Sequence, residues 1–274
     1  MTDLARRIGP TSRVRVTESS PGVDAEREDH VVAEEPLEIR IASPGVEARR
    51  AWVTMRTPGH DFELAAGWAF HEGLVSTRTL SEVAYCTDED LTAEQEFNVV
   101  TLRTSAPVDL AHRHDAMSAG SSACGVCGKD SIGAALETVR GARWAGPPPE
   151  AEVVRRLPAL LREEQSVFAR TGGVHAAGLF TAEGDRHVVR EDVGRHNAVD
   201  KVTGARLLAG SPVADAYLVV SGRAGFELVQ KAVASGVGSL VAVGAPTSLS
   251  VHLAREAGLG LFGFTKGERT VRYA

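Results

Sequence analysis

Two cysteines three positions apart carry the clearest chemistry in the sequence. Residues 121–131 read SSACGVCGKDS, which places Cys124 and Cys127 among small and polar residues. A Cys-x-x-Cys pair can act as a redox dithiol, as half of a zinc site, or as a nucleophilic thiol with a neighbour that protects it. The thiolate is the reacting species, and its pKa falls from about 8.5 to roughly 3.5–7.5 in such pairs. The spacing alone leaves these three uses open.

The surroundings of the pair favour an exposed nucleophile. Zinc needs two further ligands, but there is no second cysteine pair, and His112 and His114 match no strong zinc spacing. A thioredoxin-like motif follows an early strand, whereas this pair lies in the middle of the chain in a Gly/Ser-rich loop. A thiolate in such a loop can carry a sulfur atom as a persulfide from a donor to an acceptor.

A second polar cluster, REDVGRHNAVDK at 190–201, lies at the expected start of a helix. Arg195, His196 and Lys201 can line a pocket that orients an anionic ligand or moves a proton. Alternatively Asp192 caps the helix and His196 pairs with Asp200 one turn later, which needs no ligand. The residues support both interpretations equally. His175, in GGVHAAG, is in the same way either catalytic or a histidine at a strand end.

Two strand-to-helix turns share one design, SGRAGFE at 221–227 and GAPTSLS at 244–250. In a parallel sheet both turns lie at the carboxyl edge, where ligands of such sheets bind. Free N–H groups at a helix start favour an anion, and Arg223 can add a charge-assisted hydrogen bond. Thr247 and Ser248 stand where the second helix begins. The alternative is that the glycines only permit tight bends and that Ser248 caps the helix.

Composition limits the classes of function. The 274 residues carry 30 Lys+Arg against 36 Asp+Glu, a net charge of −6, so no overall basic field exists to hold a nucleic acid polymer. The first residues lack the apolar run of a signal peptide and no later stretch approaches a membrane span, which predicts a cytoplasmic protein. Three cysteines, with Cys86 the third, do not suggest a disulfide framework. We expect Cys86 to pack at a strand end.

Hydrophobic patterning predicts an α/β protein of two units. Residues 1–28 lack periodicity and are expected to form a mobile arm. Residues 29–115 predict an α+β unit, with strands in HVVAEEPLEIRIA, RRAWVTMRT and FNVVTLR and a helix after Pro58. Residues 116–130 are expected to be a mobile cysteine loop. Residues 131–274 alternate strands with helices near 131–140, 150–170, 195–208, 225–234 and 248–257, which predicts a largely parallel sheet covered by helices.

Several long motifs in a fixed order resemble the formate dehydrogenase accessory sulfurtransferases, the FdhD family. They are MRTPGHDFELAAGW (55–68), SSACGVCGK (121–129), GGVHAAGLF (172–180), REDVGRHNAVDK (190–201), SGRAGFELVQKA (221–232) and GAPTSLSVHLAREAGLGLFGF (244–264). The resemblance implies a sulfurtransferase that takes persulfide sulfur from a cysteine desulfurase. The acceptor it implies is the molybdenum cofactor, as bis(molybdopterin guanine dinucleotide), before that cofactor enters formate dehydrogenase.

The same resemblance assigns residues by position. Cys124 matches the persulfide cysteine of the family and Cys127 its partner, with no resident metal. The guanine dinucleotide contact falls on Phe264, Thr265, Lys266, Gly267, Glu268 and Arg269, and we add Arg223, Thr247 and Ser248 from the two turns. A free guanine nucleotide is expected to mimic this end of the cofactor. The physical alternative for residues 264–269 is a surface turn that closes the domain.

The family likeness also implies a fold and an assembly. It implies a cytidine-deaminase-like three-layer α/β/α sandwich with a smaller N-terminal α+β unit, and a homodimer. The zinc signature of the deaminases is absent, since Ala123 precedes Cys124 and no Glu stands two positions after His175. Two rival functions stay open: a chaperone that binds the cofactor without transferring sulfur, and a dithiol oxidoreductase.

Overall fold

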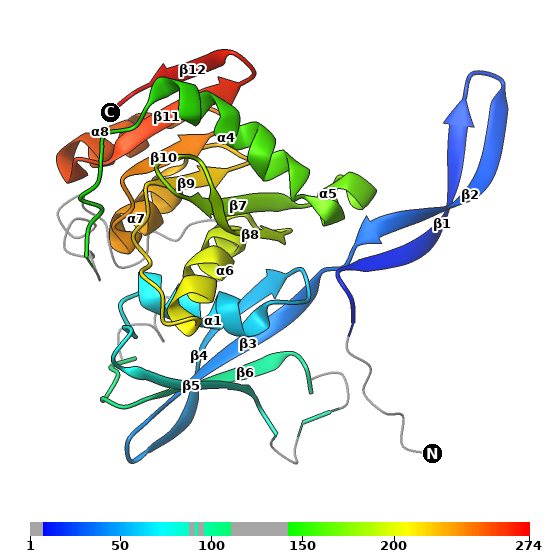
Figure 1. The fold of residues 1–274 in the computed structure, drawn as a ribbon. Coiled ribbons are helices and arrows are strands. Elements are labelled where there is room, and N and C mark those ends of the chain that lie inside the picture. Colours follow the sequence, from blue (N-terminus) through cyan, green and yellow to red (C-terminus); the bar gives the residue numbers. More distant parts are fainter. Residues whose placement is uncertain (1–7, 88–90, 93–95, 111–141) are drawn as a thin grey trace.

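A computed structural model describes residues 8–87, 91–92, 96–110 and 142–274 of the chain. Figure 1 shows two packed bodies, an upper one built on a six-stranded sheet and a lower one built on a four-stranded sheet, with a long hairpin projecting to one side. None of the helices in these ranges is both long enough and apolar enough to cross a lipid bilayer.

The six-stranded sheet has the order β12-β11-β10-β9-β7-β8. Its strands are β7 (His175–Phe180), β8 (Arg186–Asp192), β9 (Tyr217–Val220), β10 (Ser239–Ala242), β11 (Gly260–Lys266) and β12 (Arg269–Arg272). Only β9, β10 and β11 run parallel to one another, and the pairings β7–β8, β7–β9 and β11–β12 are antiparallel. The prediction of a largely parallel sheet is therefore wrong, although it holds at the strands that precede the two turns.

Helices cover both faces of this sheet, so the domain has the three layers expected. Leu218 and Val220 of β9 pack toward α6 (Arg195–Leu208), α7 (Phe226–Ser235) and α8 (Ser248–Ala257). Tyr217 and Val219, which alternate with them, pack toward α4 (Ala151–Glu163) on the other face. The helix expected over 150–170 is interrupted after α4, and α5 (Ser166–Thr171) follows it. The helix expected at 131–140 lies outside the described residues.

The smaller unit is a four-stranded sheet with one helix on its inner face. Its strands, in the order β4-β3-β6-β5, are β3 (Glu35–Ser43), β4 (Val46–Arg56), β5 (Leu80–Tyr85) and β6 (Val99–Thr104). Helix α1 (Asp61–His71) lies on this sheet, and Trp68 of α1 stacks on Trp52 of β4 with ring centroids 5.0 Å apart. The predicted α+β unit is thus present, with β5 as a strand that the sequence analysis missed.

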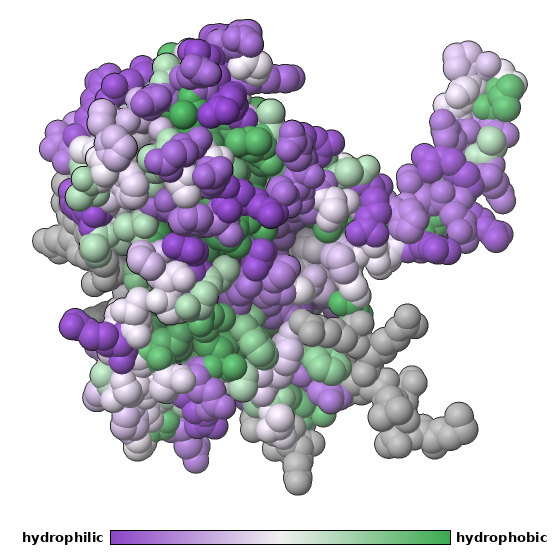
Figure 2. All heavy atoms as spheres, in the orientation of Figure 1, coloured by the Kyte–Doolittle hydropathy of each residue, from purple (hydrophilic) through white to green (hydrophobic). Residues whose placement is uncertain are grey.

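The described part of the N-terminal region forms a β-hairpin. Strands β1 (Thr11–Ser20) and β2 (Val23–Val32) pair antiparallel over their whole length, whereas residues 1–28 were expected to form an aperiodic arm. Charged residues alternate with valine here, and they hide the strand pattern without preventing backbone pairing. Figures 1 and 2 show this hairpin standing away from the body with a mainly hydrophilic surface.

Two glycines let helix α1 of the smaller unit lie directly against helix α6 of the larger domain. A Cβ at Gly67 would stand 1.8 Å from the carbonyl oxygen of Asp200, and a Cβ at Gly204 would stand 1.8 Å from that of Glu63. Any side chain at either position would therefore overlap the backbone of the other helix. The two glycines fix the distance between α1 and α6, and with it the placement of one sheet on the other.

A buried charge cluster lies beside this helix contact. The Lys231 ammonium donates to both carboxylate oxygens of Asp200, at 2.7 and 3.0 Å, and His71 Nδ1 lies 2.6 Å from the same carboxylate. Burial raises the pKa of the Asp200 carboxyl, but Lys231 and His71 together outweigh burial and the pKa is lowered. Burial also lowers the pKa of His71, so its neutral ring donates to Asp200 and accepts from Ser235 at 2.8 Å. The cluster connects α1, α6 and α7.

We predict that Gly204→Ala lowers the free energy of unfolding by about 3 kcal/mol, because α1 and α6 must separate to admit the methyl group. Urea denaturation followed by circular dichroism measures this. Gly9→Ala is the control, since a Cβ there meets nothing within 4 Å, and it should change stability by less than about 0.5 kcal/mol. Equal stability of the two variants would contradict the close helix contact.

Candidate functional site

The two turns and the end of the last long strand meet at one edge of the sheet. Because β9, β10 and β11 are parallel, the segments that follow them emerge side by side at their carboxyl ends. Gly244 N–H donates to Gly222 O at 2.9 Å, Ala224 N–H to Ala245 O at 3.1 Å, and Phe264 N–H to Gly244 O at 3.0 Å. The predicted residues Arg223, Thr247 and Phe264, up to 41 positions apart in sequence (264 − 223), therefore belong to one hydrogen-bonded surface.

Phe264 has the most unusual backbone on this surface. Its φ is +50°, in the left-handed region that residues other than glycine seldom adopt, and it lies at an irregularity in the β11–β12 pairing. The side chain is 40% exposed, and the Arg269 guanidinium lies 5.2 Å from its ring centroid. Such strain at an exposed aromatic residue is typical of ligand-contacting positions.

The other residues of 264–269 divide into exposed and buried. Lys266, Gly267, Glu268 and Arg269 are exposed, and Gly267 takes a φ of +58° in the turn between β11 and β12. Thr265 is fully buried and its hydroxyl lies 2.9 Å from that of Thr270. Of the six residues predicted to contact the guanine dinucleotide, Thr265 alone has a side chain directed into the protein.

The second turn presents a helix start to the same surface. Thr247, and not Ser248, is the N-cap of α8: its hydroxyl accepts from Ser250 N–H at 3.3 Å. Ser248 is the first residue of the helix and is exposed. Arg223, Lys266 and Arg269 are exposed cations on the neighbouring segments. Three cations beside the positive end of a helix favour an anionic ligand such as a phosphate.

A second polar group lies at this edge, next to the turn after β9. Ser221 Oγ accepts from Ala176 N–H at 2.9 Å, which holds the start of β7 and His175 against this turn. Burial lowers the pKa of His175, and so does the nearby Arg195. His196 Nε2 lies 3.3 Å from Glu227 on the first turn of α7. The structure thus brings together the two histidines whose roles the sequence left open.

The His196–Glu227 contact is better described as a contact between two neutral groups than as an ion pair, and His196 Nε2 accepts from Arg195 Nε at 3.3 Å. Burial, with the positive charges of Lys231 and Arg195, lowers the pKa of His196 to about 4. Burial also raises the pKa of the Glu227 carboxyl. Both shifts favour the neutral forms. Glu227 was not singled out in the sequence, although an acidic residue just after Gly225 at a helix start was a signal for it.

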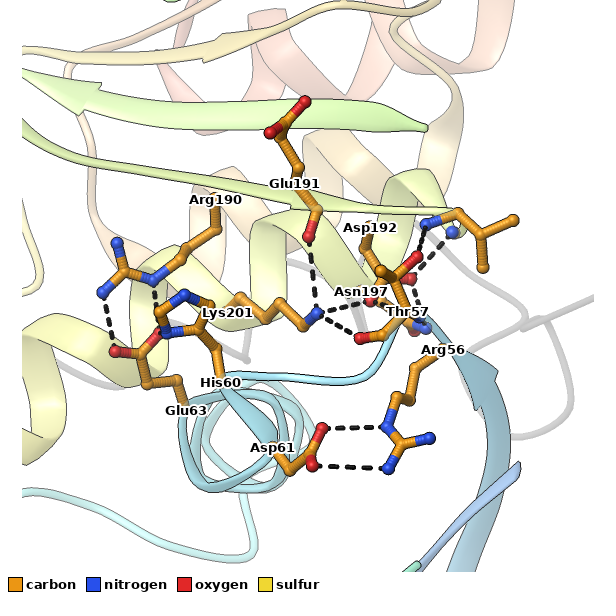
Figure 3. A network of polar contacts seen from close by, with 12 residues as sticks. Arg56, Thr57, His60, Asp61, Glu63, Arg190, Glu191, Asp192, Asn197 and Lys201 are labelled. Carbon is orange, nitrogen blue, oxygen red and sulfur yellow. Dashed lines mark hydrogen bonds and ion pairs between the residues drawn. The ribbon is translucent and has the colours of Figure 1, made fainter. Parts of the chain in front are cut away.

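Neither interpretation of residues 190–201 holds in full, because the N-cap of α6 is Gly194 and not Asp192, and the pocket interpretation fails at Lys201. Lys201 is 1% exposed, and its ammonium lies 2.7 Å from Asp192 and 2.9 Å from the carbonyl oxygen of Thr57 (Figure 3). Asp192 also accepts from Thr57 N–H at 3.1 Å and from Asn197 at 3.1 Å. Asp200 pairs with Lys231 and His71 instead of His196. This part of the motif holds the two units together.

A second ion pair in Figure 3 joins the same two units. Arg190 of β8 binds Glu63 of α1 with two hydrogen bonds of 2.5 and 2.7 Å, and His60 Nδ1 lies 3.2 Å from Glu63. Burial raises the pKa of Glu63. The hydrogen bonds from Arg190 and His60 together outweigh burial and lower the pKa from its ordinary 4.5 to about 2.

Both cysteines of the predicted transfer site, and His112 and His114, lie outside the described residues. Cys86 follows β5, is buried as expected, and lies with its sulfur 3.7 Å from the Arg40 guanidinium. Among residues 8–87, 91–92, 96–110 and 142–274, no cluster of three or more His, Cys, Asp or Glu side chains has the geometry of a metal site.

A cleft of about 240 Å³ opens at the opposite, amino edge of the sheet. Trp144, Tyr217, Arg143 and Arg272 contribute to its walls, together with the proline run 147–149. The C-caps of α7 and α8, Gly236 and Gly258, also line it. Helix C-termini carry partial negative charge, so this cleft suits a phosphate less well than the carboxyl edge.

The chain matches one protein family over most of its length. The model of the FdhD/NarQ family matches residues 32–274. The sulfur carrier protein FdhD of Streptomyces avermitilis is 45% identical over 271 residues, covering 96% of this chain and 94% of that protein. The sulfur carrier protein FdhD of Anaeromyxobacter dehalogenans is 42% identical over 289 residues, covering 100% of this chain and 96% of that protein.

A solved structure has the same fold. The crystal structure described as that of a formate dehydrogenase accessory protein from Desulfotalea psychrophila superposes with a TM-score of 0.72, covering 96% of each chain at 22% identity. The mixed α/β architecture is therefore shared by proteins whose sequences have diverged widely.

We predict that Glu63→Gln destabilises the protein by about 2 kcal/mol at pH 7. Because the pKa of Glu63 is lowered from 4.5 to about 2 in the folded state, its contribution is present above pH 4.5 and disappears as the pH falls toward 2. Denaturant titrations of both proteins at several pH values should therefore converge in acid. Glu82→Gln, which removes an exposed pair with Arg103, should have no measurable effect at any pH, and a constant difference for Glu63→Gln would contradict the assignment.

Proposed function

The chain belongs to the FdhD/NarQ family, and from that premise we propose how it serves as a sulfur carrier for formate dehydrogenase. The function itself follows from identities of 42–45% over nearly the whole length of proteins named sulfur carrier protein FdhD. The residue roles, the cofactor and the sulfur donor are our proposal. The convergence of three segments at the carboxyl edge of β9, β10 and β11 is the observation that supports the cofactor site.

Loading takes place on Cys124. Its thiolate attacks the outer sulfur of a cysteine persulfide on a desulfurase, and the desulfurase cysteine leaves as a thiolate while a new S–S bond forms on Cys124. No net oxidation occurs, because one S–S bond replaces another. The chain acts in this step as a sulfurtransferase. Gly125 and Gly128, each next to a cysteine of the pair in the sequence, have no side chain that could hinder a large protein donor.

Release uses Cys127. Its thiolate attacks the inner sulfur of the Cys124 persulfide, which forms a Cys124–Cys127 disulfide and expels hydrosulfide. The two electrons that turn sulfane sulfur into sulfide come from the dithiol, so an external thiol must later reduce the disulfide. The acceptor is the molybdenum centre of bis(molybdopterin guanine dinucleotide), which is the cargo of this reaction.

The guanine dinucleotide end of the cargo lies on the carboxyl edge. Arg223, Lys266 and Arg269 meet its phosphates, Gly267 lets the backbone approach, and the exposed ring of Phe264 offers a face for the base. Thr247 and Ser248 add the start of α8. Glu268 borders the site, and Thr265 contributes through its backbone. Guanosine diphosphate carries the same base and phosphates and should occupy this surface alone.

The remaining features that we propose come from the family likeness. The three layers observed agree with a cytidine-deaminase-like fold, and we assign the protein to that class. We further propose that it works in the cytoplasm as a homodimer, where it meets both the cysteine desulfurase and formate dehydrogenase.

Sulfur transfer is tested with a cysteine desulfurase and cysteine labelled with radioactive sulfur. We expect the wild-type chain to take up label that thiol reductants release, Cys124→Ser to take up none, and Cys127→Ser to load but to release sulfide much more slowly. Cys86→Ser is the control and should behave as wild type. A wild-type chain that binds the cofactor but never takes up label would indicate a chaperone without sulfur transfer. Turnover with thioredoxin-type partners in the absence of any sulfur donor, which Cys127→Ser abolishes, would instead indicate a dithiol oxidoreductase.

Nucleotide binding is tested by calorimetry with guanosine diphosphate. Arg269→Ala should weaken binding about tenfold, because it removes both a phosphate contact and the cation beside Phe264. Phe264→Ala should have a similar effect. Arg272→Ala removes an arginine of the same strand that lines the cleft at the other edge, and it should leave the affinity unchanged. Weaker binding by Arg272→Ala alone would indicate that the nucleotide binds at the amino edge of the sheet.

A further inference from the structure

The β1–β2 hairpin is a long ribbon that contacts the body only at its root. Ten residue pairs join its strands, from Thr11–Val32 at the root to Ser20–Val23 at the tip, which makes it about 30 Å long. At the root, Ala33 N–H donates to Pro10 O at 3.0 Å and Val32 lies against Gly173. Most of the length of the ribbon lies in solvent (Figure 1).

One face of this ribbon carries five apolar side chains among its ten residues. The register places Val14 and Val16 of β1 on the same face as Val23, Ala25 and Val31 of β2. Val23 is 65% exposed and Val31 40% exposed. The charges on this face compensate one another, because Arg27 lies 2.6 Å from Glu18 and 3.2 Å from Asp29. A two-stranded ribbon is marginally stable alone and gains stability when further strands join it.

The outer edge of β1 is the one open to such an addition. In the part of the chain that the structure describes, β1 pairs with β2 and with no other strand. Strand β2 contacts α5 near the root, so its own outer edge is partly obstructed. An open strand edge offers a row of unpaired N–H and C=O groups to a strand from another chain.

The charge pattern of β1 favours pairing of this edge with the same edge of a second copy of the chain. A twofold axis at Val16 sets Val16 opposite its own copy, Arg15 opposite the partner's Thr17, and Arg13 opposite the partner's Ser19. No two like charges then face each other. The middle of β2 differs, because an axis at Glu26, Arg27 or Glu28 sets a charged side chain against its own copy, which is destabilising.

We propose that two copies of the chain join through antiparallel pairing of their β1 strands about Val16. The result is one four-stranded sheet in the order β2-β1-β1-β2, with the valines of both ribbons on one face. An isologous contact of this kind requires a self-complementary surface, which β1 provides. The proposal rests on the proposed homodimer and supplies its contact surface. Residues 11–31 lie outside the range that the family model matches.

The test uses two opposite charges at the centre of the contact. In Val16→Arg and in Val16→Glu each homodimer sets two like charges against each other. The association of both variants should therefore be weaker than that of wild type by a factor of about ten or more. An equimolar mixture sets Arg against Glu and should form dimers again. Sedimentation velocity at micromolar concentration measures all three samples and the wild type. Val23→Arg, at the tip of the same face, is the control and should dimerise as wild type.

The outcomes separate this surface from the carrier function. Weak association of each variant, with recovery in the mixture, supports the β1 contact. Wild-type dimers in both variants, or no recovery in the mixture, overturn it and leave the homodimer on another surface. A wild-type chain that stays monomeric yet accepts labelled sulfur on Cys124 overturns the β1 contact while the carrier function stands. Loading with labelled sulfur also shows that each variant is folded.

Discussion

The contact between α1 and α6 is the constraint on which the rest of the structure depends. Gly67 and Gly204 bring the two helix backbones so close that no side chain fits between them. Buried charges surround the contact, with Asp200, Lys231 and His71 on one side and Asp192 with Lys201 on another. Removing one member of such a pair leaves an unpaired buried charge, which costs about 3–5 kcal/mol. The two sheets therefore have one relative position.

This constraint also positions the candidate site. Helix α6 begins with Arg195 and His196 at the carboxyl edge of the sheet and continues one turn later into Asp200, which is fixed by Lys231 of α7. Helix α7 begins after Arg223 and Gly225, so its start is held at the same edge. The residues at this edge, where we propose that the cofactor binds, are thus supported by buried ion pairs. Rigid support of this kind is what an exposed binding surface needs to hold a large ligand in one orientation.

Much of the larger domain could be predicted from the sequence, because its strands are short apolar runs between helices of regular period. β9 and β10 were found for that reason, and so were the turns after them. The direction of β7 could not be predicted, since an apolar run such as HAAGLF is the same in a parallel and an antiparallel pairing. The hairpin was missed because its stability comes from backbone pairing, while its side chains are charged. β12, with four residues, was too short to give a pattern.

In the candidate site, too, some features could be predicted from the sequence and others could not. The two turns lie at the carboxyl edge of β9 and β10, as their sequence predicted, and the ligand site there stays a prediction. Burial could not be inferred: Thr265 and Lys201 have the residue types of a binding site, yet both are enclosed. Trp144 gave no signal in the sequence, because its importance comes from neighbours that are distant along the chain, and Glu227 was indicated only by its place at a helix start. The cysteine chemistry was inferred from residue types alone, and the structure describes neither thiol.

The central claim is that the three segments at the carboxyl edge form one surface for the guanine end of the cargo. Amide hydrogen exchange with and without guanosine diphosphate tests it most directly, since it reports every segment of the chain at once. The account predicts that the nucleotide slows exchange together in residues 222–227, 244–250 and 264–269. Slower exchange confined to residues 143–149 and 236–239, at the amino edge, would contradict it.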